Sequence, residues 1–355
     1  MKYILFIIIL LAISLQATEP VVYSLINSDR LNIHRRNDEY ITYLRGNVHF
    51  FYDDIEFKAD MADIYERQEF VVLRGNVIVL QDTLKITCND AQYYHQNQYL
   101  NVQGNVVLTE TINQETVRRI TCDSGTQYRE RGEFILQGNV LSYDEKESLF
   151  SSSGFATFNQ QTGYGYMIER PVIWRTGADS LALYAEKIEF YEDTNRVVAS
   201  FNVITQNQDI TVKSSFLIYY GDEEKIVYIG NPQFYTESGD GNADLLTVYL
   251  EDNDVKEIHM DENCYIEFSA NNSLDRDSWI RSDFMKLFYD SGNPKEFIAT
   301  ENVSSFFLQQ QQVQKNNMDN NVSGDILHIL FNEESKVQLL QKTDNISGKY
   351  RFIRK

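Results

Sequence analysis

The stretch FKADMADIYERQEFVVLRGNV, residues 57–77, contains the pattern that organises the whole chain. A small residue and a polar residue, Ala59-Asp60, lead to the aromatic Tyr65, and a Gly-Asn-Val tripeptide begins ten residues after this tyrosine. In the next copy, Leu84-Lys85-Ile86-Thr87-Cys88 alternates apolar and polar side chains, which is the period of a half-buried β-strand. The glycine suits a bend or bulge because it tolerates a positive φ. Each copy therefore predicts a pair of strands.

The pattern recurs along almost the entire chain. Gly-Asn-Val begins at residues 46, 75, 104 and 138, at intervals of 29, 29 and 34 residues. The element from small residue to aromatic or apolar residue spans Ala59–Tyr65, Cys88–Tyr94, Cys122–Tyr128, Ala185–Tyr191, Ser214–Tyr220, Ala243–Tyr249, Ser282–Phe288 and Gly324–Leu330. Such self-similarity is the signature of a stacked repeat fold. We therefore predict an all-β solenoid of strand pairs about 30 residues long.

One face of the predicted strands is apolar throughout the stack. Residues at even offsets from the repeated tyrosine share a strand face. We expect the following residues on this face to point inward and to line the interior: Val71, Leu73, Val77, Val79, Leu100, Val102, Val106, Leu108, Phe134, Leu136, Val140, Val197, Val203, Ile226 and Phe234.

The first residues have the composition of a secretory signal. Lys2 precedes the short apolar run from Tyr3 to Leu15, and Ala17 offers a small residue for cleavage. The run is too short for a comfortable membrane span. We expect residues 1–17 to be a signal peptide and the mature chain to be exported and soluble.

Two further segments interrupt the repeat. Residues 160–176 contain two glycines and a proline, which predicts a junction between a module at 24–165 and a second module at 166–352. Residues 309–321 begin with four glutamines and are predicted to form a long exposed loop.

Composition excludes several classes of function. The 355 residues include 52 acidic and 32 basic ones, and the net charge of −20 argues against binding to nucleic-acid phosphates. The five histidines are dispersed, and the three cysteines have no zinc-site spacing and are expected to lie buried in strands. No short catalytic motif is present. We therefore expect no enzyme activity, no metal, no cofactor and no nucleic-acid partner.

The repeated strands, above all Phe57–Tyr65 continuing to Leu73-Arg74-Gly75-Asn76-Val77 behind a signal peptide, resemble the OstA-like family. The simplest members of this family are LptA-type periplasmic bridge proteins of lipopolysaccharide transport, and a related domain begins the outer-membrane translocon. The resemblance implies a slanted antiparallel β-jellyroll, open at both ends. It also implies binding of lipopolysaccharide or a similar multi-acyl lipid, with acyl chains against the inward residues.

The same resemblance implies the partners. They would be related jellyroll domains of an inner-membrane anchor and of the outer-membrane translocon, together with head-to-tail self-association. Unpaired strand edges invite such pairing, and we expect them near Tyr23–Ile33 and Lys349–Ile353.

Two other functions are compatible with a repeat fold. A packed interior would suit a purely structural or adhesive exported solenoid. A polysaccharide-active β-helix would need carboxylates in line, and Asp60, Asp123, Asp244, Asp283 and Asp325 share one position of the repeat. The repeated tyrosines predict either a ladder that fixes the register of the strands or a rim to a lipid groove.

Overall fold

The computed structural model describes residues 23–113, 115–146, 148–177, 180–237, 239–252, 254–269, 278–310 and 316–354. The predicted signal peptide, residues 1–17, lies outside these ranges. The N-terminal strands are β1 (Tyr23–Asn27), β2 (Arg30–Arg36), β3 (Glu39–Tyr52), β4 (Ile55–Tyr65), β5 (Phe70–Gln81), β6 (Leu84–Tyr94), β7 (Tyr99–Ile112), β8 (Glu115–Tyr128), β9 (Glu133–Asp144) and β10 (Leu149–Asn159).

The middle and C-terminal strands include shorter elements. They are β11 (Tyr164–Ile168), β12 (Val172–Arg175), β13 (Leu181–Tyr184), β14 (Lys187–Tyr191), β15 (Arg196–Gln206), β16 (Ile210–Tyr220), β17 (Lys225–Ile229), β18 (Gln233–Thr236), β19 (Gly239–Asn242), β20 (Leu245–Glu251), β21 (Asp254–Phe268), β22 (Ser278–Asp290), β23 (Asn293–Gln310), β24 (Asn316–Phe331), β25 (Val337–Thr343) and β26 (Ser347–Arg354). A single 3₁₀ turn, η1 (Glu192–Thr194), interrupts the described strands.

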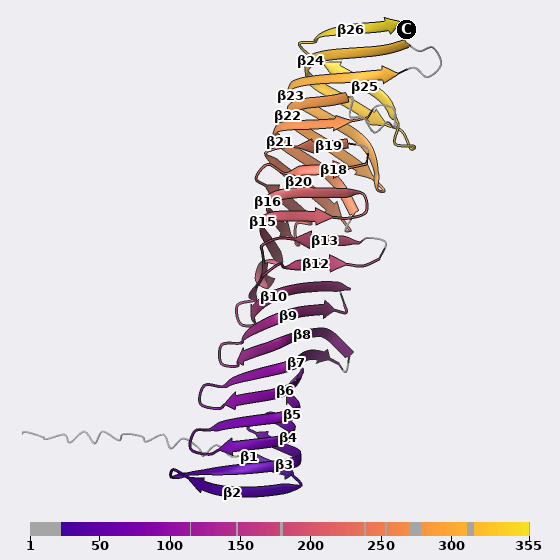
Figure 1. The fold of residues 1–355 in the computed structure, drawn as a ribbon. Helices are drawn as coiled ribbons and strands as arrows, with labels where there is room; N and C mark the ends of the chain where they lie inside the picture. The colour runs from indigo at the N-terminus through magenta and orange to yellow at the C-terminus, as the bar shows by residue number, and fades with distance from the viewer. Residues whose placement is uncertain are drawn as a thin grey trace, which may run out of the picture.

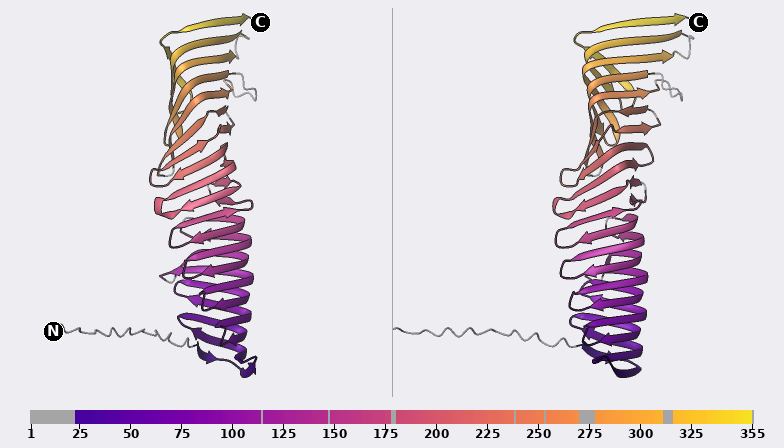
Figure 2. Two further views of the ribbon diagram at one scale, coloured as in Figure 1. Left: turned by 90° about the vertical axis from the view of Figure 1, so that its left-hand side faces the viewer. Right: turned by 60° about the vertical axis from the view of Figure 1, so that its left-hand side comes forward.

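The strands stack into one long antiparallel column. All 26 described strands belong to one hydrogen-bonded sheet whose ladders are antiparallel. Successive strands pair from β3 to β10 and from β20 to β24, and between them β10 and β16 each pair with two short strands. The column runs from the N-terminal strands at one end to the C-terminal strands at the other, and the strands are slanted and curved across it (Figures 1 and 2). The all-β jellyroll architecture predicted from the repeat is confirmed.

The pairing of the long strands is interrupted at the repeated tripeptide, which occurs in β3, β5, β7 and β9. In β3 the pairing with β4 skips Gly46 and Asn47, whose φ angles are 76° and 46°. The bend divides the strand into two half-strands on opposite sides of the interior. We call the half-strands that end at the repeated aromatic residue, together with the half-strands paired with them, arm A, and the half-strands beyond the bends arm B. The line of bends is the spine, and the side where the hairpin turns of the two arms face each other is the open side.

A hydrogen bond between side chains closes eight of the repeated bends in the described residues. The Asn76 amide donates to the Asp60 carboxylate at 2.9 Å, across two paired strands. Equivalent pairs are Asn47–Asp29, Asn105–Asn89, Asn139–Asp123, Asn202–Glu186, Asn263–Asp244, Asn302–Asp283 and Asn345–Asp325. The position of the repeat that Asp60 occupies therefore lies on the outside of the spine, where its side chain fixes the bend.

Replacing Gly75 by alanine tests the bend directly. Gly75 has a φ of 77°, and a Cβ there would lie 2.4 Å from the Asp60 carboxylate. Gly292 has nearly the same φ, 78°, but nothing within 4 Å of its Cβ position. We expect Gly292→Ala to lower the free energy of unfolding by about 1–2 kcal/mol through backbone strain alone. Gly75→Ala should cost about 1–3 kcal/mol more because of the clash. Urea unfolding of both variants measures the difference, and equal losses would refute the role of the bend.

The interior between the arms contains two clusters of buried apolar side chains. The first extends from Leu44 to Val140 and the second from Met167 to Ile329, and Ala156 packs against both. Strand pairing is continuous through this region, because β10 pairs with β9 on one side and with β11 and β12 on the other. The two clusters thus share one sheet.

The structure differs from the predicted pattern in two places. The segment 309–321, predicted to be a loop, is strand up to Gln310 and again from Asn316, because backbone pairing between β23 and β24 does not depend on side-chain polarity. Between β11 and β12 the bend is made by Glu169 and Arg170, with φ angles of 63° and 60°. This bend lacks the Gly-Asn pair, so the repeat could not be recognised there from the sequence.

Candidate functional site

The apolar interior between the arms is the candidate site, and all fifteen residues predicted to line it face this interior. Phe134, Val197, Ile226 and Phe234 are half-buried and pack against the clusters. The other eleven are buried: Val71, Leu73, Val77, Val79, Leu100, Val102, Val106, Leu108, Leu136, Val140 and Val203. The inward direction of these side chains follows from the period of two along a strand. The period does not predict which of these side chains are fully buried, because their exposure depends on how close the two arms lie.

Aromatic side chains fill the N-terminal part of the interior. Phe57 and Phe50 are fully buried, and their ring centroids lie 5.3 Å apart. Tyr93 reaches Phe57 from the opposite arm at 5.4 Å and Tyr52 at 5.7 Å. Burial raises the pKa of the Tyr93 hydroxyl. This aromatic plug (Phe50, Tyr52, Phe57 and Tyr93) leaves no open channel along the first strands.

Polar contacts join the two arms across the open side of the same region. The hairpin between β3 and β4 supplies Asp53 and Asp54. Asp53 lies 3.0 Å from the His95 ring, and Arg129 donates to Asp54 at 2.6 Å. The hydrogen bond from Arg129 lowers the pKa of the Asp54 carboxyl. The carboxyl groups of this arm-B hairpin therefore act as a latch against arm A.

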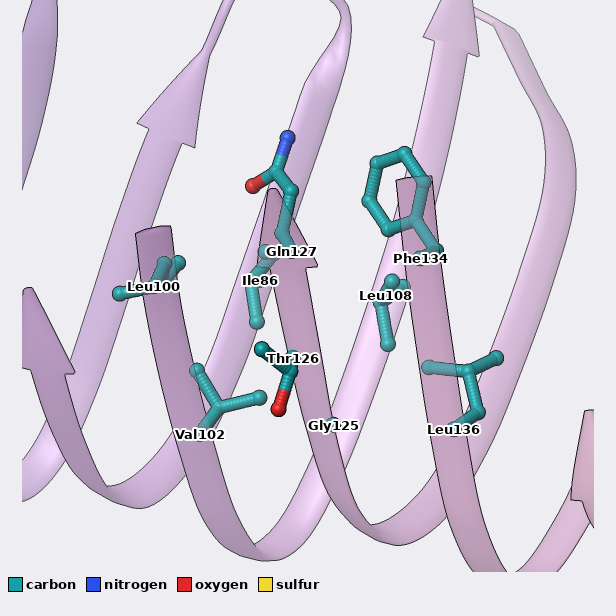
Figure 3. Close-up of a pocket in the computed structure, with 9 residues that line it drawn as sticks. All are labelled: Ile86, Leu100, Val102, Leu108, Gly125, Thr126, Gln127, Phe134 and Leu136. Atoms are coloured by element: carbon teal, nitrogen blue, oxygen red, sulfur yellow. The ribbon is translucent and has the colours of Figure 1, made fainter. Parts of the chain in front are cut away.

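The side chains of the interior pack less tightly immediately beyond this latch. A void of about 10 Å³, room for at most one water molecule, lies between the arms near Gln127 and Phe134. Figure 3 shows its lining residues projecting from neighbouring strands: Ile86, Leu100, Val102, Leu108, Gly125, Thr126, Gln127, Phe134 and Leu136. Nearly all of the lining atoms are therefore hydrocarbon.

The C-terminal part of the interior is more exposed than the N-terminal part. In the described residues, five partly buried apolar side chains pack against the first cluster and seventeen against the second. One buried polar contact joins the arms there, between the Thr205 and Tyr228 hydroxyl groups at 2.9 Å. Burial raises the pKa of Tyr228 to about 12. The apolar interior of the second half of the column is thus partly exposed, and we call this partly exposed interior the trough.

In the residues that the structure describes, three histidines lie in single ion pairs and the three cysteines are buried. His49, His259 and His328 each lie beside a single glutamate. In the described ranges, no group of three His, Cys, Asp or Glu side chains is arranged to hold a metal ion. Cys88, Cys122 and Cys264 are buried, and burial raises the pKa of each thiol, to about 12, 11 and 12 respectively. These thiols are therefore protonated and unreactive at neutral pH.

The repeated tyrosines form a ladder on the outer face of arm A. Tyr94 stacks on Phe70 at 4.3 Å and on Tyr99 at 4.5 Å, and Tyr99 continues to Tyr128 at 5.6 Å. The Arg131 guanidinium covers the end of this run, 4.0 Å from the Tyr128 centroid. Phe70 and Tyr99 follow the hairpin turns and were not recognised as ladder residues in the sequence. Because the rings stack on one another outside the trough, the ladder fixes strand register.

A family model and solved structures match parts of this chain. A family model described as OstA-like protein matches residues 21–166. Among solved structures, LptH from Pseudomonas aeruginosa, described as the LptA-homologous periplasmic component of the lipopolysaccharide transport device, matches with 17% identity and a TM-score of 0.27. The match covers 29% of this chain and 75% of LptH. No curated protein matches.

The described residues contain no helix long and apolar enough to cross a membrane. The family match covers the strands that carry the four Gly-Asn-Val tripeptides, the latch and the aromatic plug. The resemblance to the OstA-like family predicted from the repeat is thus confirmed over residues 21–166.

Proposed function

We propose that this protein is an exported periplasmic bridge that carries lipopolysaccharide, or a similar multi-acyl lipid, toward the outer membrane. The observation that carries the proposal is the apolar trough with partly exposed walls along residues 166–352, in a chain whose N-terminal part is OstA-like. Each buried CH₂ group contributes about 0.8 kcal/mol, so several acyl chains suffice for firm binding. No reaction is required, because an energised partner upstream would supply direction.

We further propose that the two modules, 24–165 and 166–352, have different roles. The first is packed by the aromatic plug and latched by Asp53 and Asp54, so lipid would enter it only when the arms part. The second has open walls and would hold acyl chains without rearrangement. Lipid contact is therefore expected first at Val197, Ile226 and Phe234 of the second module, which are half-buried, and at the lining residues of the first module only in an opened state.

Photo-crosslinking in cells tests this order of contact. A photo-reactive phenylalanine analogue at Phe234 is expected to capture lipopolysaccharide, because this side chain is half-buried against the second cluster. The same analogue at Phe57, which is fully buried in the plug, is expected to yield at least tenfold less adduct. Phe216 lies on the outer face and is 37% exposed, so it serves as the matched control for accessibility alone. Equal labelling at Phe216 and Phe234 would exclude the trough as the lipid site.

The ends of the column support the proposed partners. Among the described residues, the half-strands β1 and β2 pair only with β3, and β25 and β26 pair only with β24. Each end thus has one unpaired edge, a template for strand addition. Inward-facing apolar residues are exposed at both ends: Leu31 and Ile33 at the first, Leu340 and Tyr350 at the second.

The strand directions favour head-to-tail contacts. At the first end the chain runs from arm B in β1 to arm A in β2, whereas at the last end it runs from arm A in β25 to arm B in β26. The first end of a second copy would therefore continue the antiparallel order. Related jellyroll domains of an inner-membrane anchor and an outer-membrane translocon are the other proposed occupants of these edges.

A structural or adhesive exported solenoid is the second candidate, because the N-terminal interior is packed without a channel. Mass spectrometry of lipids extracted from the purified protein separates the two. Lipopolysaccharide recovered in stoichiometric amount supports the bridge, and a lipid-free protein that also fails to take up lipopolysaccharide in vitro supports the solenoid.

A further inference from the structure

A lysine points into the trough near its C-terminal end. Lys342 of β25 pairs with Leu327 of β24, and paired residues in neighbouring strands direct their side chains to the same face. Leu327 is fully buried in the second cluster, so Lys342 also faces the interior. Its position is two residues before the bend formed by Asp344 and Asn345. The aliphatic part of the Lys342 side chain therefore lies inside the column, next to the spine.

The ammonium group reaches from arm A to arm B. Its Nζ donates to the Ser305 hydroxyl at 3.0 Å and to the Val322 carbonyl oxygen at 2.5 Å. Ser305 is 1% exposed, so this contact lies inside the column. Both acceptors are neutral, and an ammonium has three N–H donors, so one donor is left for a further acceptor. No carboxylate pairs with Lys342 in the part of the chain that the structure describes.

A glycine provides space for this lysine. Gly324 occupies the position filled by Ala59, Cys88, Cys122 and Ser282 in other copies of the repeat. A Cβ on Gly324 would lie 3.0 Å from Cγ and 3.2 Å from Cδ of Lys342. The φ of Gly324 is not in the left-handed region, so the backbone does not require glycine here. Its absent side chain instead leaves a niche for the lysine stem.

The missing counter-ion distinguishes Lys342 from Arg118, another cation on the inward face of its strand. Arg118 also faces the interior, but it contacts the carboxylates of Glu110 and Asp144 at 3.8 and 3.4 Å. Burial of a charged group is unfavourable unless it is paired. Burial accordingly lowers the pKa of Lys342 from its ordinary value to about 8. An anion that entered the trough beside Lys342 would remove this penalty.

We propose that Lys342 binds the phosphate of an anionic acyl lipid at the C-terminal mouth of the trough. The mouth is lined by Leu340 and Tyr350, which are 44% and 62% exposed and would contact the acyl chain. The ammonium would donate its remaining N–H to a phosphate oxygen. This site rests on the proposed lipid-carrying function and adds a charged recognition point to a protein whose net charge is −20.

Two amphiphiles with the same chain test the site on the full mature protein. Decyl phosphate and decyl maltoside, both below their micelle concentrations, are titrated calorimetrically. A charge-assisted hydrogen bond predicts about tenfold tighter binding of decyl phosphate. Lys342→Met should abolish this preference and leave the affinity for decyl maltoside unchanged. Lys336→Met is the matched control, because Lys336 is exposed and already pairs with Glu334.

A second measurement follows the titration of Lys342 in the unmutated chain and needs a variant only to assign the signal. NMR of the protein labelled with ¹³C at the lysine ε-carbons follows the titration of each lysine and leaves all three N–H donors in place, with Lys342 assigned from the spectrum of Lys342→Met or, should that variant not fold, of Lys342→Arg. Decyl phosphate is expected to raise the pKa of Lys342 from about 8. Inorganic phosphate alone should not do so at the same concentration.

The outcomes separate the two proposals. If decyl maltoside binds but decyl phosphate binds no tighter, or if Lys342→Met keeps the preference, the lysine site is refuted and the trough stands. If neither amphiphile binds, both proposals fail. If inorganic phosphate alone raises the pKa equally, the site belongs to free phosphate and its assignment to a lipid is wrong.

Discussion

Phe57→Ala is expected to lower the free energy of unfolding by about 3–5 kcal/mol. Phe57 is fully buried, stacks on Phe50 and contacts Tyr93 on the other arm, so its removal leaves a cavity that links both arms. Equilibrium unfolding in urea, followed by circular dichroism, measures the loss. A decrease this large would make Phe57 one of the principal stabilising residues of the first module.

The matched control for this loss is Phe216→Ala. Phe216 is 37% exposed on the outer face of β16, and its truncation should cost less than about 1 kcal/mol. Phe57→Leu keeps most of the buried volume and should fall between the two. Equal losses for Phe57→Ala and Phe216→Ala would show that the N-terminal interior is not packed, and the proposed difference between the two modules would then fail.

Loss of self-association is the second large effect, expected when either end receives a charge. Ile33 at the first end is 56% exposed and Leu340 at the last end is 44% exposed. An aspartate at either position would be buried without a partner in a head-to-tail contact, at a cost of several kcal/mol. Sedimentation velocity should show oligomers that grow with concentration for the unmodified protein, because head-to-tail contacts do not close. Ile33→Asp and Leu340→Asp should each remain monomeric.

Mixing the two variants distinguishes the proposed contact from other modes of association. Ile33→Asp retains an intact last end and Leu340→Asp retains an intact first end. Their mixture is therefore expected to form dimers but no longer oligomers. Ile112→Asp is the control, since Ile112 is 47% exposed at the end of β7, within the stack. A monomeric unmodified protein, or a mixture that stays monomeric, would contradict the head-to-tail contact.

The fold could be predicted from the sequence because it follows from local rules about strands and bends. A strand has a side-chain period of two, and a Gly-Asn pair accepts positive φ angles, so the repeat identified both the strands and the bends. The inward face of all fifteen predicted lining residues follows from this period alone. Where the pair is replaced by Glu169 and Arg170, the bend persists and the signature disappears, because the backbone of the neighbouring strands imposes it.

The sequence by itself therefore determined the all-β stack, its period and the direction of each lining side chain, since these depend on neighbours along the chain. Only the tertiary structure decided where the interior is closed. The latch joins Asp54 to Arg129, 75 residues apart, and Lys342 reaches Ser305, 37 residues away. Such contacts depend on the distance between the arms and on the curvature of the sheet. These quantities are set by packing across the whole column, and no local pattern of residues encodes them.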